Sequence, residues 1–240
     1  MCGIVGEVRF DQTSPDLSAL TQAASRMAPR GPDAEGLHAQ GPVGFAHRRL
    51  KIIDLSDAAQ QPMIDSELGL TIVFNGCIYN HADLRLELEA KGYRFFSNGD
   101  TEVLLKAYHA WGEDFVQRLN GMFAFAIAER DTGRLLLGRD RLGIKPLYYA
   151  ETPGGLRFAS TLQALTCFPD VDTGLDADAL AFYFSFHAVV PPPFTMARGI
   201  KKLAPATLMR VEPDGSRRTR SYWDVLFEPQ DHERGYSHAD

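Results

Sequence analysis

The stretch that decides the fold is Met122-Phe123-Ala124-Phe125-Ala126-Ile127-Ala128. Successive side chains of a β-strand point to opposite faces, so Phe123, Phe125 and Ile127 share one face and the three alanines share the other. Both faces are therefore apolar, one bulky and one small. This pattern predicts a strand that is buried on both sides, inside a layered fold.

Further strands and helices are predicted on both sides of this stretch. The predicted strands are residues 4–10, 43–46, 51–53, 70–74, 134–138, 147–149, 156–159, 207–211 and 217–222. The predicted helices are residues 17–27, with Ser14 or Asp16 as the N-cap, 80–91, 101–111 and 176–186. Asn75-Gly76 follows one predicted strand and is expected to form a turn. Strands interspersed with helices, several of them joined by hairpins, predict an α+β layered sandwich.

Composition excludes several classes of protein. The chain has 240 residues, 45% of them hydrophobic, with 25 Lys and Arg against 31 Asp and Glu, so its net charge is −6. A nucleic-acid-binding protein normally carries a basic surplus. No apolar stretch is long enough to span a bilayer, and the N-terminus is not a secretory signal. Three cysteines do not make a disulfide framework and indicate a reducing compartment. We expect a cytoplasmic protein that binds neither nucleic acid nor a membrane.

Sequence motifs for metal and nucleotide binding are also missing. The sequence contains no C-x-x-C pair and no H-E-x-x-H helix, so a structural zinc site is not expected. It contains neither G-x-G-x-x-G nor a P-loop. We therefore expect no metal and no bound cofactor in this part of the chain.

Cys2 is an unusual residue at the second position. If Met1 is removed, Cys2 carries a thiol and a free α-amino group, whose pKa of about 7.7–8.0 leaves part of it neutral at working pH. One residue would then supply both a nucleophile and its general base. A small second residue also simply favours removal of methionine. Cys2 alone leaves both interpretations open.

Seven short motifs, taken together in this order, resemble one family. They are Cys2-Gly3-Ile4-Val5-Gly6, Arg30-Gly31-Pro32-Asp33, His47-Arg48-Arg49-Leu50, Asn75-Gly76-Cys77-Ile78-Tyr79-Asn80, Asn98-Gly99-Asp100-Thr101-Glu102, Gly121-Met122-Phe123-Ala124-Phe125 and Arg139-Asp140-Arg141-Leu142-Gly143. The chain resembles the N-terminal glutaminase domain of class II glutamine amidotransferases, in particular the asparagine synthetase-like branch. The resemblance covers about residues 1–165 and continues more weakly to about residue 224.

The resemblance implies roles for five residues. Cys2 would be the nucleophile, and the Asn75 side chain with the Gly76 N–H would form the oxyanion hole. Arg49 would bind the carboxylate of L-glutamine, and Asp100 would bind its ammonium group. Each has a purely structural alternative: a solvated basic face for Arg49, a plain turn for Asn75-Gly76 and a helix N-cap for Asp100.

Other residues of the motifs are expected to act structurally. Arg30 and Asp33 either stabilise their loop or reach the site. Arg139 and Asp140 are predicted to form a structural ion pair rather than to take part in catalysis.

Two departures from the family pattern concern specificity. Cys77 stands where asparagine synthetases usually have an acidic side chain that helps to recognise glutamine. Cys77 is therefore predicted to line the substrate site through its backbone, or to be only a small buried residue beside it. Thr161 and Gln163 replace the usual Glu and Lys. With Asn-Gly-Cys, they resemble the branch that amidates N-acetylglutaminylglutamine.

The resemblance also implies a fold, a domain organisation and partners. The fold would be a four-layer αββα sandwich, two antiparallel sheets between helix layers, of the N-terminal-nucleophile hydrolase type. In it, we expect the bulky face of residues 122–128 to pack against the second sheet and the alanines to lie beneath helices. Residues 1–224 would form the glutaminase domain, and residues 225–240 a linker or tail. No Ser-Gly-Gly-x-Asp-Ser loop occurs. ATP and magnesium are thus expected only in a synthetase domain, attached in cis or bound in trans, and a homodimer is left open.

The expected activity is hydrolysis of L-glutamine to glutamate and ammonia through a thioester on Cys2. One rival is another N-terminal-nucleophile amidase, which would not need Arg49 and Asp100 to hold an amino acid. A second rival is a non-catalytic domain of the same fold, in which Met1 is retained or Cys2 is inert.

Overall fold

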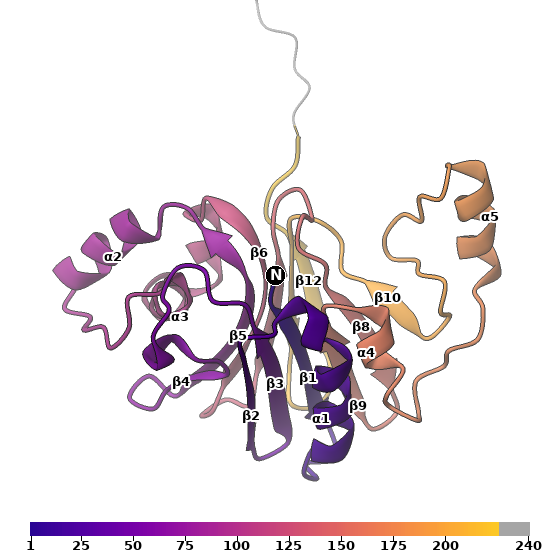
Figure 1. The fold of residues 1–240 in the computed structure, drawn as a ribbon, viewed down its shortest axis with the longest axis horizontal. Helices are drawn as coiled ribbons and strands as arrows, with labels where there is room; N and C mark the ends of the chain where they lie inside the picture. Colours follow the sequence, from indigo (N-terminus) through magenta and orange to yellow (C-terminus); the bar gives the residue numbers. More distant parts are fainter. Residues whose placement is uncertain (226–240) are drawn as a thin grey trace, which may run out of the picture.

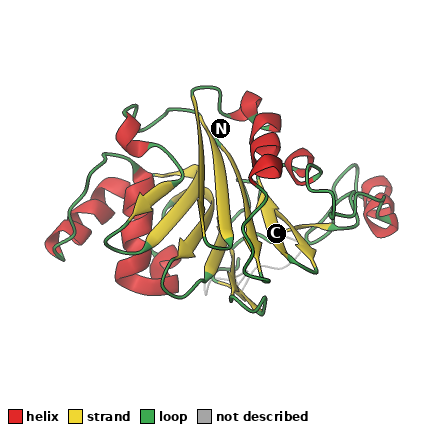
Figure 2. Cartoon of the chain, turned by 90° about the horizontal axis from the view of Figure 1, so that it is seen from below, coloured by secondary structure: helices red, strands yellow, loops and turns green. Residues whose placement is uncertain are grey.

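Two six-stranded β-sheets pack face to face between helices in the computed structural model, which describes residues 1–225 (Figure 1). The predicted linker, residues 225–240, lies outside the described residues except for Val225. The view from below in Figure 2 shows helices on both outer sides of the strands. The four-layer α+β architecture expected from the sequence is confirmed. In the described part of the chain, every helix is too short or too polar to cross a membrane.

Each sheet is antiparallel throughout. In order across the first sheet, which we call sheet A, the strands are β10 (Ile200–Lys202), β8 (Tyr148–Thr152), β9 (Gly155–Ala159), β1 (Gly3–Arg9), β3 (Val43–Arg49) and β2 (Ala34–Gln40). In sheet B they are β12 (Arg217–Ser221), β11 (Thr207–Val211), β7 (Leu135–Arg139), β6 (Gly121–Glu129), β5 (Leu70–Ile78) and β4 (Met63–Asp65).

Different helices cover the two sheets. The α-helices are α1 (Leu17–Arg26), α2 (His81–Ala90), α3 (Asp100–Trp111), α4 (Leu162–Leu165) and α5 (Ala177–Ser185). Three short 3-10 helices occur at Ala28–Arg30, Asp57–Ala59 and Gly112–Gln117. Helices α1 and α4 pack on sheet A, whereas α3 packs on sheet B and supports α2. Helix α5 stands at one edge of the molecule, away from both sheets (Figure 1). Asp16 caps α1 as predicted, since its carboxylate accepts a hydrogen bond from the Ala19 N–H.

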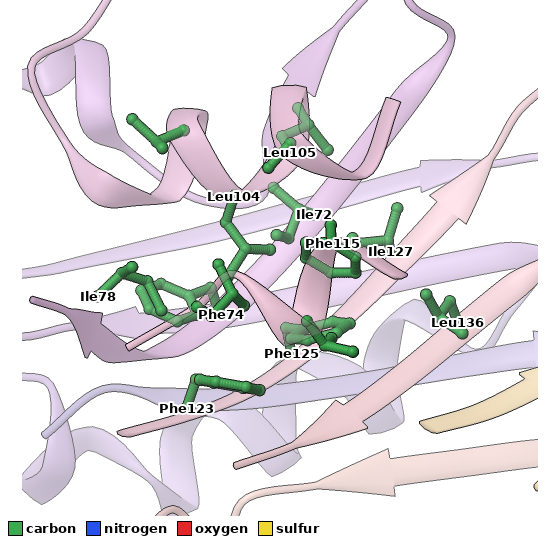
Figure 3. Close-up of a cluster of buried hydrophobic side chains, with 14 of the residues drawn as sticks. Ile72, Phe74, Ile78, Leu104, Leu105, Phe115, Phe123, Phe125, Ile127 and Leu136 are labelled. Atoms are coloured by element: carbon green, nitrogen blue, oxygen red, sulfur yellow. The ribbon is translucent and has the colours of Figure 1, made fainter. Parts of the chain in front are cut away.

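Strand β6 is buried on both faces, but its two faces pack the opposite way from our expectation. Phe123, Phe125 and Ile127 lie in the core between sheet B and the helices, with Leu104 and Leu105 of α3 (Figure 3). Full burial of each phenylalanine stabilises the fold by about 1.5–3 kcal/mol.

The alanines of β6 face sheet A instead. There Ala124, Ala126 and Ala128 share a core with Phe45 and Phe158, whose rings meet edge to face with centroids 5.7 Å apart. Because these large rings from sheet A fill the space between the sheets, sheet B must supply small residues opposite them.

Three strands escaped prediction, and one predicted strand does not form. Strand β2 has no apolar stripe because it is the exposed edge of sheet A, and β4 and β10 have only three residues each. Residues 51–53 form no strand, since the chain leaves sheet A after β3. Asn75-Gly76 is not a turn: β5 continues through it to Ile78, and Asn75 pairs with Ala124 of β6.

Candidate active site

The predicted nucleophile lies beside the end of β3. Gly3 at the start of β1 pairs with Arg48, which places Cys2 next to the residues that follow. The Leu50 N–H donates a hydrogen bond to Cys2 Sγ at 3.4 Å, and Cys2 Sγ lies 3.7 Å from the Leu50 carbonyl oxygen. The Cys2 thiol is therefore held against Leu50, although it is only partly buried.

One cavity of about 150 Å³ brings together every site residue expected from the sequence. Its lining includes Cys2, Arg49, Asn75, Gly76, Cys77 and Asp100. Cys2 immediately precedes β1 and Arg49 ends β3, both strands of sheet A, whereas the others come from β5 of sheet B and the first turn of α3. The cavity lies where β1 and β3 pack against β5.

The period of β5 decides which of its side chains enter the cavity. Phe74 and Ile78 face the helices, and Val73 faces sheet A. Asn75 and Cys77 share the face of Val73, because side chains two residues apart point the same way. Both therefore project toward the sheet that carries Cys2.

Asn75 supplies a free hydrogen-bond donor to the cavity. The residue is 1% exposed, and its Nδ2 atom has no hydrogen-bond partner among residues 1–225. A buried donor without a partner costs about 1–3 kcal/mol of stability, so native proteins seldom keep one without a use. A ligand oxygen in the cavity would satisfy it.

Glycine is needed at position 76 because a side chain would not fit there, and not because of an unusual backbone conformation. A Cβ atom at this position would lie 2.4 Å from the Met122 carbonyl oxygen and 2.6 Å from the Phe74 ring. Its φ angle is not in the left-handed region, so a turn does not require this glycine. The close approach of β6 to β5 requires it.

Arg49 keeps a positive charge in the cavity. It is 5% exposed, and its guanidinium donates hydrogen bonds to the carbonyl oxygens of Ser56, at 2.8 Å, and Asp54. In the described part of the chain, no carboxylate forms an ion pair with it. The solvated basic face considered for Arg49 is therefore wrong. The guanidinium is held by backbone carbonyl groups, and the Asp54 carboxylate acts on it from nearby without forming an ion pair, which leaves room for a ligand carboxylate.

Asp100 is the first residue of α3 and not its cap. Gly99 occupies the N-cap position, and Asp100 Oδ2 accepts a hydrogen bond of 2.9 Å from the Ile78 N–H. The side chain is almost fully buried, and this burial raises the pKa of the carboxyl group, although the Ile78 hydrogen bond opposes the shift. A cation bound in the cavity would offset the free-energy cost of burying the ionised Asp100 carboxylate.

Asp54, which no sequence motif indicated, links the segments that carry Arg49 and Asp100. One oxygen of its carboxylate accepts from the Ser56 N–H and the other from the Asn98 N–H, each at 2.8 Å. These hydrogen bonds therefore connect the loop after β3 with the loop before α3. The Asp54 side chain follows two isoleucines in the sequence, and no local pattern marks it as a bridge.

A buried ionic cluster also holds the loop before α3 in place. The Glu102 carboxylate accepts hydrogen bonds from the N–H groups of Phe96 and Ser97 and from Ser97 Oγ. Its charge is balanced by Lys106 at 3.0 Å, which also contacts Asp65 at 2.7 Å. All three charged side chains are nearly inaccessible to solvent.

The remaining motif residues stabilise loops. Arg30 Nε donates to the Cys2 carbonyl oxygen at 3.1 Å, and Asp33 accepts from the Lys51 N–H at 2.8 Å. Neither lines the cavity. The ion pair predicted between Arg139 and Asp140 does not form. Arg139 donates instead to three backbone carbonyls, and Asp140 accepts from four backbone N–H groups.

The cavity contains titratable groups but no histidine from the described part of the chain. Burial lowers the pKa of His47 to about 3, so this residue is neutral between the sheets. Burial also lowers the pKa of the terminal amino group, carried here by Met1. It raises the pKa of the Cys2 thiol, against the Leu50 hydrogen bond, the terminal amino group and Arg49.

Metal coordination has no visible basis in the described residues. No three or more His, Cys, Asp or Glu side chains within residues 1–225 are arranged to hold a metal ion. Burial, together with Asp100, raises the pKa of the Cys77 thiol, and this thiol lines the cavity as an uncharged group.

Comparison with known proteins agrees with this arrangement. Residues 1–223 match the family described as glutamine amidotransferase domain. Glutamine-hydrolyzing asparagine synthetase 3 of Bacillus subtilis is 36% identical over 228 residues, which cover 94% of this chain and 37% of that protein. Asparagine synthetase 1 of the same organism is 39% identical over 232 residues, covering 95% and 36%. The chain thus spans little more than a third of the length of these relatives.

Among solved structures, the glutamine phosphoribosylpyrophosphate amidotransferase of B. subtilis has the same fold. The TM-score is 0.66 at 16% identity, over 94% of this chain and 50% of that one. The N-terminal-nucleophile hydrolase type of fold is confirmed.

Proposed function

Because this chain belongs to the class II glutamine amidotransferase domain family, we propose that it hydrolyses L-glutamine to glutamate and ammonia, with Cys2 as the nucleophile. The observation that carries this proposal is the cavity itself. Among residues 1–225, it combines a thiol, a buried amide donor without a partner, a guanidinium without an ion pair and a buried carboxylate.

The two charged residues fit an amino acid. A free α-amino acid carries a carboxylate and an ammonium group on one carbon atom. Arg49 offers a forked cation for the first group, and Asp100 offers a carboxylate for the second. The Arg49–Asp54–Asn98 connection keeps the two groups at a set separation, so a zwitterion can bind without reorganising the site.

The chemistry requires removal of Met1, after which Cys2 carries the amino group. The neutral amine accepts the thiol proton, and Sγ attacks the side-chain amide carbon of glutamine. The oxyanion that forms would be bound by Asn75 Nδ2 and the Gly76 N–H. The C–N bond then breaks, and the nitrogen takes the proton from the amine and leaves as ammonia. A water molecule attacks the resulting thioester, which restores the thiol and releases glutamate.

We infer that the ammonia serves an ATP-dependent amide-forming reaction in a synthetase domain, in cis or in trans. The relatives that support this inference are named asparagine synthetases. Asparagine formation and amidation of N-acetylglutaminylglutamine are the two acceptor reactions that we propose to compare. Hydrolysis itself should need no metal or cofactor, whereas ATP and magnesium belong to the synthetase step.

A diazo-ketone analogue of glutamine tests the proposal directly. We expect one covalent adduct on Cys2 by mass spectrometry, with Met1 absent, and ammonia release from glutamine. Cys2→Ser should abolish both. Cys167→Ser is the matched control, because this thiol is partly buried but lies outside the cavity; it should behave as the wild type.

The two rivals give different outcomes. An unlabelled protein that retains Met1 would indicate a non-catalytic domain. Hydrolysis of other amides, with a Michaelis constant for glutamine that does not respond to Arg49→Ala or Asp100→Ala, would indicate a different amidase.

A further inference from the structure

Lys145 is a buried cation in the cavity to which neither the sequence motifs nor the proposed chemistry assigns a role. The residue is 4% exposed and lies between β7 and β8. Its side chain lines the same cavity as Cys2 and Cys77. Lysine is seldom buried to this extent unless it is paired with an acidic group.

The loop around Lys145 is built to hold it in place. The Lys145 N–H donates to Asp140 Oδ2, and the Lys145 carbonyl oxygen accepts from Arg139 Nε, each at 2.9 Å. Asp140 also accepts from the N–H groups of Phe123, at 3.1 Å, and Ile144, at 2.8 Å, which attaches the loop to β6. Arg139 and Asp140 therefore act together to present Lys145 to the cavity.

The ammonium of Lys145 has no acidic partner within residues 1–225. No ion pair and no side-chain hydrogen bond involves its Nζ atom there, in contrast to Lys106 and Lys202. Lys202 donates to the Val190 carbonyl oxygen at 2.8 Å outside the cavity. The Lys145 side chain has little contact with solvent, and the cavity that it lines is where an anion could balance its charge.

The deprotonated Cys2 thiol is one anion that could balance the charge of Lys145, and other charged groups act on it as well. Those facing Cys2 are the terminal amino group, Arg49 of β3, Asp100 of α3, Arg30 of the 3-10 helix after α1, and Lys145. Burial and Arg30 lower the pKa of Lys145, while Asp140 and the thiols of Cys2 and Cys77 oppose this. Lys145 in turn lowers the pKa of the terminal amino group.

We propose that Lys145 is an electrostatic positioning residue for glutamine hydrolysis: its unpaired ammonium favours the deprotonated forms of both the Cys2 thiol and the Cys2 amino group. A fixed positive charge stabilises a thiolate and destabilises an ammonium group. Both effects help the proton leave the nucleophile and keep the base neutral. This inference rests on the proposed role of Cys2 as the nucleophile.

The pH dependence of Cys2 alkylation by iodoacetamide provides a test that does not require glutamine. Mass spectrometry of the separate Cys2 and Cys77 peptides distinguishes the two thiols. In Lys145→Met we expect the midpoint for Cys2 to rise by about one pH unit. Alkylation at pH 7 would then be about tenfold slower. Lys145→Arg, which keeps the charge, should stay within about twofold of the wild type.

Lys202→Met is the matched control, since it removes a partly buried ammonium outside the cavity and should leave the Cys2 profile unchanged. In parallel, kcat/KM for glutamine should fall about tenfold at pH 7 in Lys145→Met and recover as the pH rises. A merely structural role would lower activity at every pH.

The outcomes separate this inference from the proposed function. An unchanged midpoint in Lys145→Met, or an equal shift in Lys145→Arg, would overturn the role of the charge. If the midpoint shifts in Lys145→Met but the wild-type protein releases no ammonia from glutamine, the electrostatic role is supported and the glutaminase proposal is refuted.

Discussion

Asp100→Asn should make the protein more stable and a weaker glutaminase at the same time. Asparagine has almost the same shape, and its side-chain oxygen can still accept the hydrogen bond from the Ile78 N–H. The substitution removes only the buried negative charge. The carboxylate is 6% exposed, so its contact with a substrate ammonium would be desolvated. Such a charge-assisted hydrogen bond contributes about 1.5–3 kcal/mol. At about 1.36 kcal/mol per tenfold, kcat/KM for glutamine should fall about 10- to 150-fold.

The effect on stability follows from the raised pKa of Asp100. The folded protein holds this proton more tightly than the unfolded chain does, so ionisation lowers the stability of the fold above the ordinary carboxyl pKa of 3.8. Asparagine cannot ionise, so Asp100→Asn avoids this loss of stability. The melting temperature without ligand should therefore rise at pH 7, and the difference from the wild type should shrink as the pH falls toward 3.8 and be lost below it.

Two assays check this pair of expectations. Ammonia release at varied glutamine concentration should show the loss mainly in the Michaelis constant, and thermal unfolding at pH 7 and pH 3 should show the gain in stability. In the wild type, mildly acidic pH should raise the Michaelis constant as Asp100 takes up its proton, whereas Asp100→Asn should lack this response. An unchanged Michaelis constant, or a lower melting temperature at pH 7, would refute the reasoning.

Three further substitutions probe the rest of the site. Asn75→Ala should lower kcat by about 10²–10³-fold with little change in glutamine binding, because it removes an oxyanion donor; steady-state kinetics would contradict this if only the Michaelis constant changed. Gly76→Ala should destabilise the fold by about 1–3 kcal/mol, since the new methyl group would overlap the Met122 carbonyl oxygen. A melting curve like that of the wild type would contradict this and show that β6 can shift away from β5 at little cost. Lys106→Met should cost about 3–5 kcal/mol in urea unfolding, because it leaves the buried Glu102 carboxylate without its cation; a loss below about 1 kcal/mol would mean that the cluster is not energetically coupled.

The members of the candidate site could be predicted from the sequence, but the way they meet could not. Cys2, Arg49, Asn75 and Asp100 stand in separate motifs up to 98 positions apart. Their common cavity depends on the packing of sheet A against sheet B and α3. Asp54 and Lys145 escaped detection because their significance lies in where their neighbours hold them, which no local pattern records.

Local physics explains which expectations about the fold were right. Two-residue periodicity identified β6 as a doubly buried strand, and the aspartate before α1 marked its N-cap correctly. The same local rules failed at Asn75-Gly76, where turn preference was overridden by continuous pairing between β5 and β6. Strand β2 was missed since an edge strand needs no apolar stripe.

The sequence by itself determined the class of fold, the doubly buried strand and the identity of the residues that could act on an amide. Side-chain periodicity and residue chemistry depend only on the residues of a short segment. Only the tertiary structure decided which face of β6 meets the helices. That choice depends on Phe45 and Phe158 of sheet A, which already fill the space between the sheets. Tertiary structure likewise decided that Asn75 has a donor without a partner among residues 1–225 and that Lys145 lines the cavity beside Cys2. Both properties are relations between a buried group and everything packed around it.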